Sequence, residues 1–201
     1  MRRNLRQNSR TYFEAVEEFN RGEFAACIDK FLALSDQGDA YSSLYAATIF
    51  DRGSVDVDHD WARARRLYKI SLEQSYLPGA ALGLALMLYH GRGGTQDFAE
   101  SGRNFELLRN NAFSQIMLGV MSLKGKGRSQ DENLALTHFD EAWRLGHPIG
   151  LKNAAIIRLH RGKYVRGTSD FVRGGVLCFW YYGIKRLPMI KSPRDTAEAI
   201  A

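Results

Sequence analysis

The chain has 201 residues, of which 45% are hydrophobic and 25% charged, and its formal net charge is +6. This length and composition fit one medium domain or one short repeat array that can bury a core. The two cysteines, Cys27 and Cys178, lie far apart in sequence, which excludes a disulfide framework and a zinc ribbon, and only four prolines favour helices over strands.

The charge is distributed unevenly along the chain. Residues 1–10 carry four arginines and no acidic residue (+4), and residues 11–141 carry thirteen basic against nineteen acidic residues (−6). Residues 142–194 carry eleven basic residues against one acidic residue (+10), and the last seven residues add −2. An acidic body with a strongly basic C-terminal end predicts two surfaces with different partners.

The first residues are basic and polar, with no apolar stretch and no small-residue cleavage site. We therefore expect no secretory signal and, given the cysteine usage, a cytoplasmic protein. We assign residues 1–11 to a basic N-terminal arm. Residues 12–38 keep the rhythm of a helix pair, with Gly22 in the turn, but lack a long glycine loop, so we interpret them as an N-terminal capping helix pair.

A repeated helical pattern begins within the capping pair and continues through residues 39–165. The second helix of each pair shows small or apolar residues at offsets of 0, 4, 7 and 11, which lie on one face of an α-helix. These faces begin at Cys27, Ala64, Ser101 and Ala135, spaced 37, 37 and 34 residues apart. A fixed period of this length predicts stacked helix pairs.

The first helix of each repeated pair is expected to end on a glycine, which accepts the left-handed conformation that stops a helix. These glycines are Gly53, Gly91 and Gly125, each six residues after a small residue. Each following loop ends in an aspartate that we predict to cap the second helix, because its carboxylate accepts free N–H groups of the first turn. These aspartates are Asp60, Asp97 and Asp131.

The best-formed copy is Leu118-Gly119-x-x-Ser122-x-x-Gly125-x-Gly127, followed by Asp131, Ala135, Ala142 and Gly146-His147. This pattern resembles the Sel-one-like (Sel1-like) repeat, a relative of the tetratricopeptide repeat, and the resemblance covers about residues 12–165. It implies an all-α fold, a right-handed α/α superhelix (solenoid) of about four to five stacked helix pairs. It also implies an adaptor or assembly scaffold rather than an enzyme.

The residues themselves give no sign of an enzyme. The five histidines form no His-x-x-x-His pair and no cluster with cysteine or acidic residues at ligand spacing. The glycine-rich segments at 91–94 and 125–129 fall where the repeat needs turns, so we interpret them as turns rather than as phosphate sites. We predict no catalytic, cofactor-binding or metal-binding residue, and no cofactor.

Residues 166–201 form the predicted basic, aromatic C-terminal helix and tail. Their uncharged run, residues 176–184, is too short to span a bilayer. Three interpretations stay open. The segment is a last solenoid helix that packs Val176, Phe179 and Tyr182 on residues 151–159, a helix that docks a partner protein, or a contact with an anionic membrane surface.

We predict a non-enzymatic scaffold or adaptor that binds a protein partner, whose identity is left open together with the oligomeric state. The candidate contacts are the first-helix residues Tyr45, Phe50, Leu88 and Met121 and the C-terminal residues Trp180, Tyr181, Lys185 and Arg186. Each of the first-helix residues faces either a binding groove or the core, and both alternatives stay open. The alternative is a peripheral membrane adaptor, alongside an envelope or polysaccharide assembly enzyme as the resemblance allows. Nucleic acid ranks lower, because the acidic body would repel a polyanion.

Overall fold

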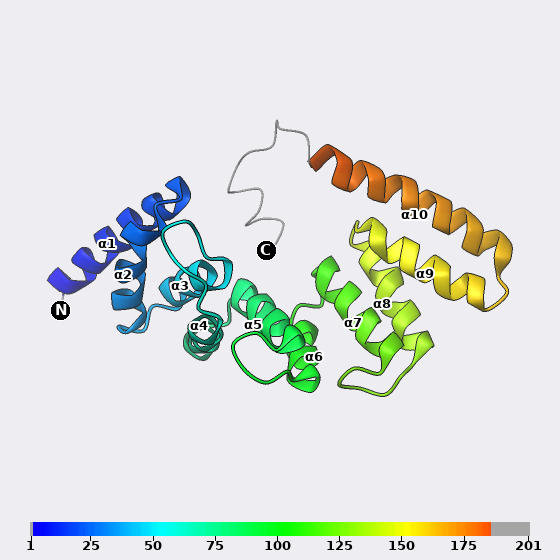
Figure 1. Cartoon of the computed structure of the whole chain (residues 1–201), viewed down its shortest axis with the longest axis horizontal. Helices are drawn as coiled ribbons and strands as arrows, with labels where there is room; N and C mark the ends of the chain where they lie inside the picture. The colour runs from blue at the N-terminus through cyan, green and yellow to red at the C-terminus, as the bar shows by residue number, and fades with distance from the viewer. Residues whose placement is uncertain (1, 186–201) are drawn as a thin grey trace. The chain divides into compact units, whose positions relative to one another are not determined.

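The computed structural model describes the backbone of residues 2–185 and the side chains of residues 8–182. Over this part of the chain it has ten α-helices and no strand (Figure 1). The chain divides into two compact units, Met1–Asp97 and Phe98–Ala201. The sequence had suggested no division at this point.

The N-terminal unit contains five helices that pack on their neighbours in sequence. Contacts run from α1 to α2, α2 to α3, α3 to α4 and α4 to α5, and α3 also touches α5. The helices are α1 (Arg2–Arg21), α2 (Phe24–Ser35), α3 (Ala40–Arg52), α4 (Trp61–Gln74) and α5 (Pro78–His90). Such a chain of neighbour contacts is what stacked helix pairs produce.

The C-terminal unit repeats the same arrangement. Contacts run from α6 to α7, α7 to α8, α8 to α9 and α9 to α10, and α7 also touches α9. The helices are α6 (Phe98–Glu106), α7 (Ala112–Lys124), α8 (Glu132–Arg144), α9 (Pro148–His160) and α10 (Tyr164–Lys185).

The predicted faces of the second helices form the interior of both units. The residues at offsets 0, 4 and 7 are buried in all four copies, which confirms this part of the periodic pattern, whereas the residues at offset 11 lie beyond the ends of these helices and are not buried. They are Cys27, Phe31 and Leu34; Ala64, Tyr68 and Ser71; Ser101, Phe105 and Leu108; and Ala135, Phe139 and Ala142. The largest of these side chains are aromatic rings, which contribute most of the apolar area buried at these faces.

The predicted glycine ends are present at all three first helices, in the left-handed helical conformation at Gly91 and Gly125 but with φ +63° and ψ +177° at Gly53. Gly125 follows α7 with φ +66° and ψ +31°, and its N–H donates to the carbonyl of Met121, so it closes the helix in the left-handed conformation. The carboxylates of Asp60 and Asp131 accept backbone N–H groups at the starts of α4 and α8, as predicted. Asn111 caps the first helix α7 in the same way, which the sequence analysis did not predict.

The glycine loops hold successive helix pairs together. A Cβ atom at Gly93 would overlap the carbonyl oxygen of Trp61, and one at Gly127 would overlap the carbonyl group of Phe98. Each loop therefore lies directly on the first turn of the second helix of the preceding pair. The residue before each of these glycines places a cation over the aromatic ring there: Arg92 over Trp61 at 5.4 Å and Lys126 over Phe98 at 4.6 Å.

Three element boundaries differ from the expected ones. Helix α1 runs without a break across the boundary expected between residues 11 and 12, because nothing in Arg2–Arg21 interrupts a helix. Helix α9 begins at Pro148 rather than at residue 151, since proline suits the first helical position and the His147 side chain accepts from the Ile149 N–H. Helix α10 begins at Tyr164, two residues before the start expected for the C-terminal helix at residue 166.

Candidate protein-interaction surface

Helix α10 packs on α9 through glycines. A Cβ atom at Gly167 would meet the Leu159 side chain at 2.8 Å, and a Cβ atom at Gly174 would meet the Lys152 backbone N at 2.9 Å. The two glycines are seven residues apart, and so are their two contacts on α9, which is the register of two antiparallel helices in close approach. Among residues 164–182, Gly167 and Gly174 alone are fully buried.

The glycine contact leaves the apolar side chains of α10 on its opposite face. Four of them lie at offsets of 0, 7, 11 and 14 along this helix, within a narrow stripe. We call this set the outer stripe: Val165, Val172, Val176 and Phe179. All four are exposed, Val165 by 90% and Phe179 by 76%. An exposed apolar row of this length marks an interaction surface more often than a solvated one.

The C-terminal end of α10 extends beyond the start of α9 (Figure 1). Its Tyr181 ring lies beside the ring of His147, the residue that caps α9, with centroids 5.1 Å apart. Trp180 and Tyr182 are exposed on either side of it. This end therefore presents aromatic surface that α9 does not cover.

A charged clamp fixes α10 to α8 and α9. The guanidinium of Arg158, on α9, donates two hydrogen bonds to Asp140 of α8 at 2.6 and 2.7 Å and one to Asp170 of α10 at 3.1 Å. The Arg158 side chain is only 8% exposed. A cation this deeply placed is stable because two carboxylates compensate it.

Positive charge lies beside the outer stripe. The described side chains of α10, residues 164–182, include two basic residues, Arg166 and Arg173, and one acidic residue, Asp170. That carboxylate is shared by Arg158 and, at 3.7 Å, by Arg166. Arg166, Arg173 and Trp180 follow one another at seven-residue spacing along one side of the stripe. Arg173 lies over the ring of Trp143 at 5.5 Å, and Arg166 is largely exposed.

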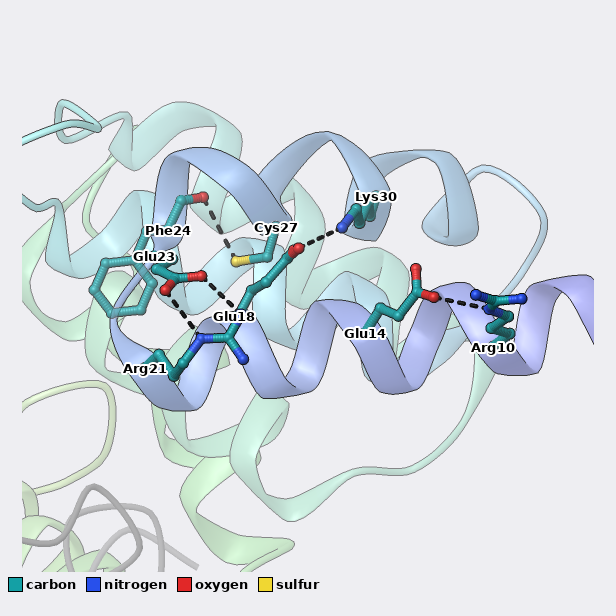
Figure 2. A network of polar contacts seen from close by, with 8 residues as sticks. All are labelled: Arg10, Glu14, Glu18, Arg21, Glu23, Phe24, Cys27 and Lys30. Atoms are coloured by element: carbon teal, nitrogen blue, oxygen red, sulfur yellow. Dashed lines mark hydrogen bonds and ion pairs between the residues drawn. The ribbon is translucent and has the colours of Figure 1, made fainter.

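The charges of the N-terminal unit are arranged differently (Figure 2). Lys30 of α2 donates to Glu18 of α1 at 2.5 Å, and Arg21 donates to both oxygens of Glu23 at 2.8 and 2.9 Å. Each of these cations thus has its own carboxylate. On α10, by contrast, Asp170 is the one carboxylate among the described residues, and Arg158 and Arg166 share it.

The structure corrects three of the candidate contacts. Leu88 and Met121 are 0% exposed and Phe50 is 7% exposed, so these side chains belong to the core and cannot touch a partner. The reason is that each of these first helices is covered by more than one helix: α3 contacts α2 and α4, α5 contacts α3 and α4, and α7 contacts α6 and α8. Tyr45 is half-buried, and its ring stacks on Phe31 with centroids 4.9 Å apart.

The C-terminal candidates differ in their exposure. Trp180 is exposed and Tyr181 is half-buried beside His147. Lys185 is the last residue of α10, and its side chain lies outside the described residues, as does Arg186 altogether. Of the three interpretations of this segment, the one in which Val176, Phe179 and Tyr182 pack on residues 151–159 does not hold, because all three side chains are exposed. The glycines at 167 and 174, seven residues apart, were the signal that could have shown which face is buried.

Two further observations concern chemistry. Burial raises the pKa of the Cys27 thiol to about 11, so it stays protonated, and its Sγ donates to the carbonyl of Phe24. Among the described residues, no three His, Cys, Asp or Glu side chains are grouped so that they could hold a metal ion. None of the described helices combines the length and the apolar composition that a membrane crossing requires.

Comparison with known proteins places the fold. No protein-family model matches the sequence, and a search of curated proteins finds no match. The structure is similar to the crystal structure of a Sel1 repeat protein from Oxalobacter formigenes, with a TM-score of 0.69 and 16% identity over 82% of this chain and 67% of that chain. It is also similar to c5321, a protective antigen of uropathogenic Escherichia coli strains with an SLR fold. That match has a TM-score of 0.64 and 21% identity, and it covers 78% of this chain but 37% of the antigen.

These similarities define the class of fold. The chain has the Sel1-like repeat fold, an all-α helical repeat solenoid. The resemblance drawn from its glycines and aspartates is thus confirmed at the level of the fold.

Proposed function

We propose that this protein is a non-enzymatic scaffold or adaptor and that it binds a protein partner on the outer stripe of α10. Repeat solenoids present extended surfaces that suit this role. The observation that carries the proposal is the position of the stripe. Glycines seat α10 on α9, so Val172, Val176 and Phe179 remain exposed although they are apolar.

The energetics favour burial of this stripe by another molecule. Complete burial of a valine or phenylalanine side chain contributes about 1.5–3 kcal/mol. Four such side chains in one row, with Trp180 beside them, supply the apolar and aromatic anchors that interfaces use. The free cysteines, Cys27 and Cys178, support a reducing compartment, and we place the protein in the cytoplasm.

A second candidate function is a peripheral membrane adaptor, which could act beside an envelope or polysaccharide assembly enzyme. The observation that favours it is the exposed Trp180 and Tyr182 close to the basic row of Arg166 and Arg173. Tryptophan and tyrosine prefer the membrane interface, and each nearby cation adds about 1 kcal/mol at an anionic surface. Flotation with anionic liposomes tests it. Wild-type protein should float and the double variant Trp180→Ala, Lys185→Glu should not, and absence of flotation at low salt eliminates this candidate.

The scaffold proposal is tested by capture from the native cell with matched variants. We expect wild-type protein to recover a defined partner that Phe179→Asp loses, because a carboxylate in the stripe cannot be buried without a partner. Phe13→Asp is the control, since Phe13 is also exposed, by 64%, but lies on α1. Circular dichroism should show that both variants stay folded. Identical recovery by wild-type and Phe179→Asp protein would refute the proposal.

A further inference from the structure

We infer that the occupant of the outer stripe is an amphipathic helix of another protein that carries acidic residues beside its own apolar row. This inference rests on the proposed function and names the chemistry of the partner. It combines the spacing of the stripe with the distribution of charge around it.

The spacing favours a helix as the occupant. Val165, Val172 and Phe179 recur every seven residues, and Val176 lies between the last two on the same face. Seven-residue recurrence is the pattern by which one helix lies along another. The stripe spans fifteen residues, from 165 to 179, and the fourteen steps between its ends make about 21 Å of helix at 1.5 Å per residue. A partner helix of about four turns covers that length.

The charges favour acidic residues on that helix. Arg166 and Arg173 line one side of the stripe at the same seven-residue spacing as the stripe itself. Asp170, the one acidic residue among residues 142–182, is held by Arg158 at 3.1 Å, and it lies 3.7 Å from Arg166. A glutamate row beside the apolar row of the partner would therefore meet an excess of positive charge, which is the complementarity that selects a partner.

The same charges disfavour a second copy of this chain. When two identical helices pair antiparallel through one stripe, the residues on a given side of one helix face the same side of the other. Arg166 and Arg173 would then face the arginines of the second copy. Like charges in this position oppose association.

The experiment uses the full chain and two fluorescein-labelled helical peptides. Both peptides have the same four-turn apolar row, and they carry either glutamate or lysine at the positions that flank it. Fluorescence anisotropy should show the glutamate peptide binding at least about ten-fold more tightly than the lysine peptide, with a preference that weakens as salt is added. The double variant Arg166→Glu, Arg173→Glu should reverse this preference.

A matched charge reversal separates the local effect from the net charge. The double variant Arg103→Glu, Arg109→Glu changes the charge by the same amount on exposed residues of α6 and the turn after it. It should leave the preference for the glutamate peptide within about two-fold of wild type, because neither residue lies on α10 beside the outer stripe. Phe179→Asp should abolish binding of both peptides.

The possible failures are distinguishable. Equal binding of the two peptides, or binding of neither while Phe179-dependent capture from the cell persists, overturns the inference and leaves the scaffold proposal standing. A dimer in sedimentation that Phe179→Asp dissolves, or Phe179-dependent binding to anionic vesicles in place of the peptides, also overturns it. Loss of Phe179-dependent capture removes both the inference and the proposed function.

Discussion

Arg158 is the residue on which three helices of the C-terminal unit converge. Its guanidinium holds Asp140 of α8 and Asp170 of α10 from a buried position on α9. Removal of this buried cation leaves Asp140 without its partner and Asp170 with Arg166 alone, at 3.7 Å, and the loss of one member of such a pair costs more than the pair itself contributes. Arg161, on the turn after α9, offers a comparison, because its ion pair with Glu132 is partly exposed.

We expect Arg158→Met to lower the free energy of unfolding by about 2–3 kcal/mol, somewhat less than for a completely buried pair because Asp140 is 45% exposed. Arg161→Met should cost less than about 1 kcal/mol. Urea unfolding of the two variants beside wild type checks both values. Similar, small losses in the two variants would contradict a structural role for the clamp.

We expect His138 to make the stability of the C-terminal unit depend on pH. Its Nδ1 lies 2.8 Å from Oε1 of Gln115, and burial, followed by the positive charge of Arg128, lowers its pKa below the ordinary 6.5. The folded protein therefore prefers the neutral ring more strongly than the unfolded chain does. The unfolded chain binds the proton first as the pH falls, so stability is lost below about pH 6.5.

The matching experiment is urea unfolding at pH 8 and pH 5. Wild-type protein should be less stable at pH 5, and His138→Gln should show a smaller difference between the two pH values. An unchanged difference in the variant would mean that other groups cause the dependence.

In helix α10, the positions of the glycines determine which side of the helix packs on α9 and which side stays exposed. Gly174 is buried against the backbone of α9, whereas a Cβ atom at the adjacent Gly175 would meet nothing within 4 Å. Both positions are glycines of the same helix, but one is packed against α9 and the other has open space around it. They form a natural pair for testing whether close approach holds α10 in place.

Gly174→Ala should lower the free energy of unfolding by about 1–3 kcal/mol, because the new methyl group forces α10 away from Lys152. Gly175→Ala should be neutral or stabilising by up to about 1 kcal/mol, since alanine favours the helix. Thermal or urea unfolding measures both. Equal effects of the two substitutions would argue against the glycine contact.

The second helices could be predicted from sequence because each has one buried face. Phe105 and Phe139 fall at the same offset in their copies, and burial on one side makes the 3.6-residue period visible. The first helices could not be resolved in this way. Leu88 and Met121 are buried in helices that contact other helices on several sides, and periodicity cannot identify a free face there.

The candidate surface could be predicted only in part. The aromatic and basic character of residues 166–182 is visible in the sequence, and Trp180 is indeed exposed. The direction of the helix is not visible, because hydrophobicity scales favour burial of Val176 and Phe179 over burial of Gly174. Backbone contact at two glycines reverses this expectation, and it depends on the three-dimensional approach of α9.

For the molecule as a whole, each of the two units has a buried apolar cluster of its own. One buried cluster in the N-terminal unit includes Phe31, Tyr68 and Leu88, and one in the C-terminal unit includes Phe139 and Ile157. In repeat proteins, stability is close to a sum of local and nearest-neighbour contributions. Damage to one unit should therefore stay largely within it.

Phe139→Ala removes a fully buried ring from the C-terminal unit and should cost about 3–5 kcal/mol there. In native-state hydrogen exchange, we expect amides of α7 and α8 to lose protection while those of α3 and α4 keep it. Equal loss across both units would show instead that the chain unfolds as one cooperative body.

The glycine loops have a consequence for how such a protein changes in length. Both observed junctions between a helix pair and the preceding one have the same parts. A cation lies over an aromatic ring that is 31 or 28 residues earlier in the sequence, and the next residue is a glycine whose position leaves no room for a side chain. A duplication or deletion that spans a whole pair would carry these parts along with it. The number of repeats can then change during evolution without new contacts having to arise at each junction.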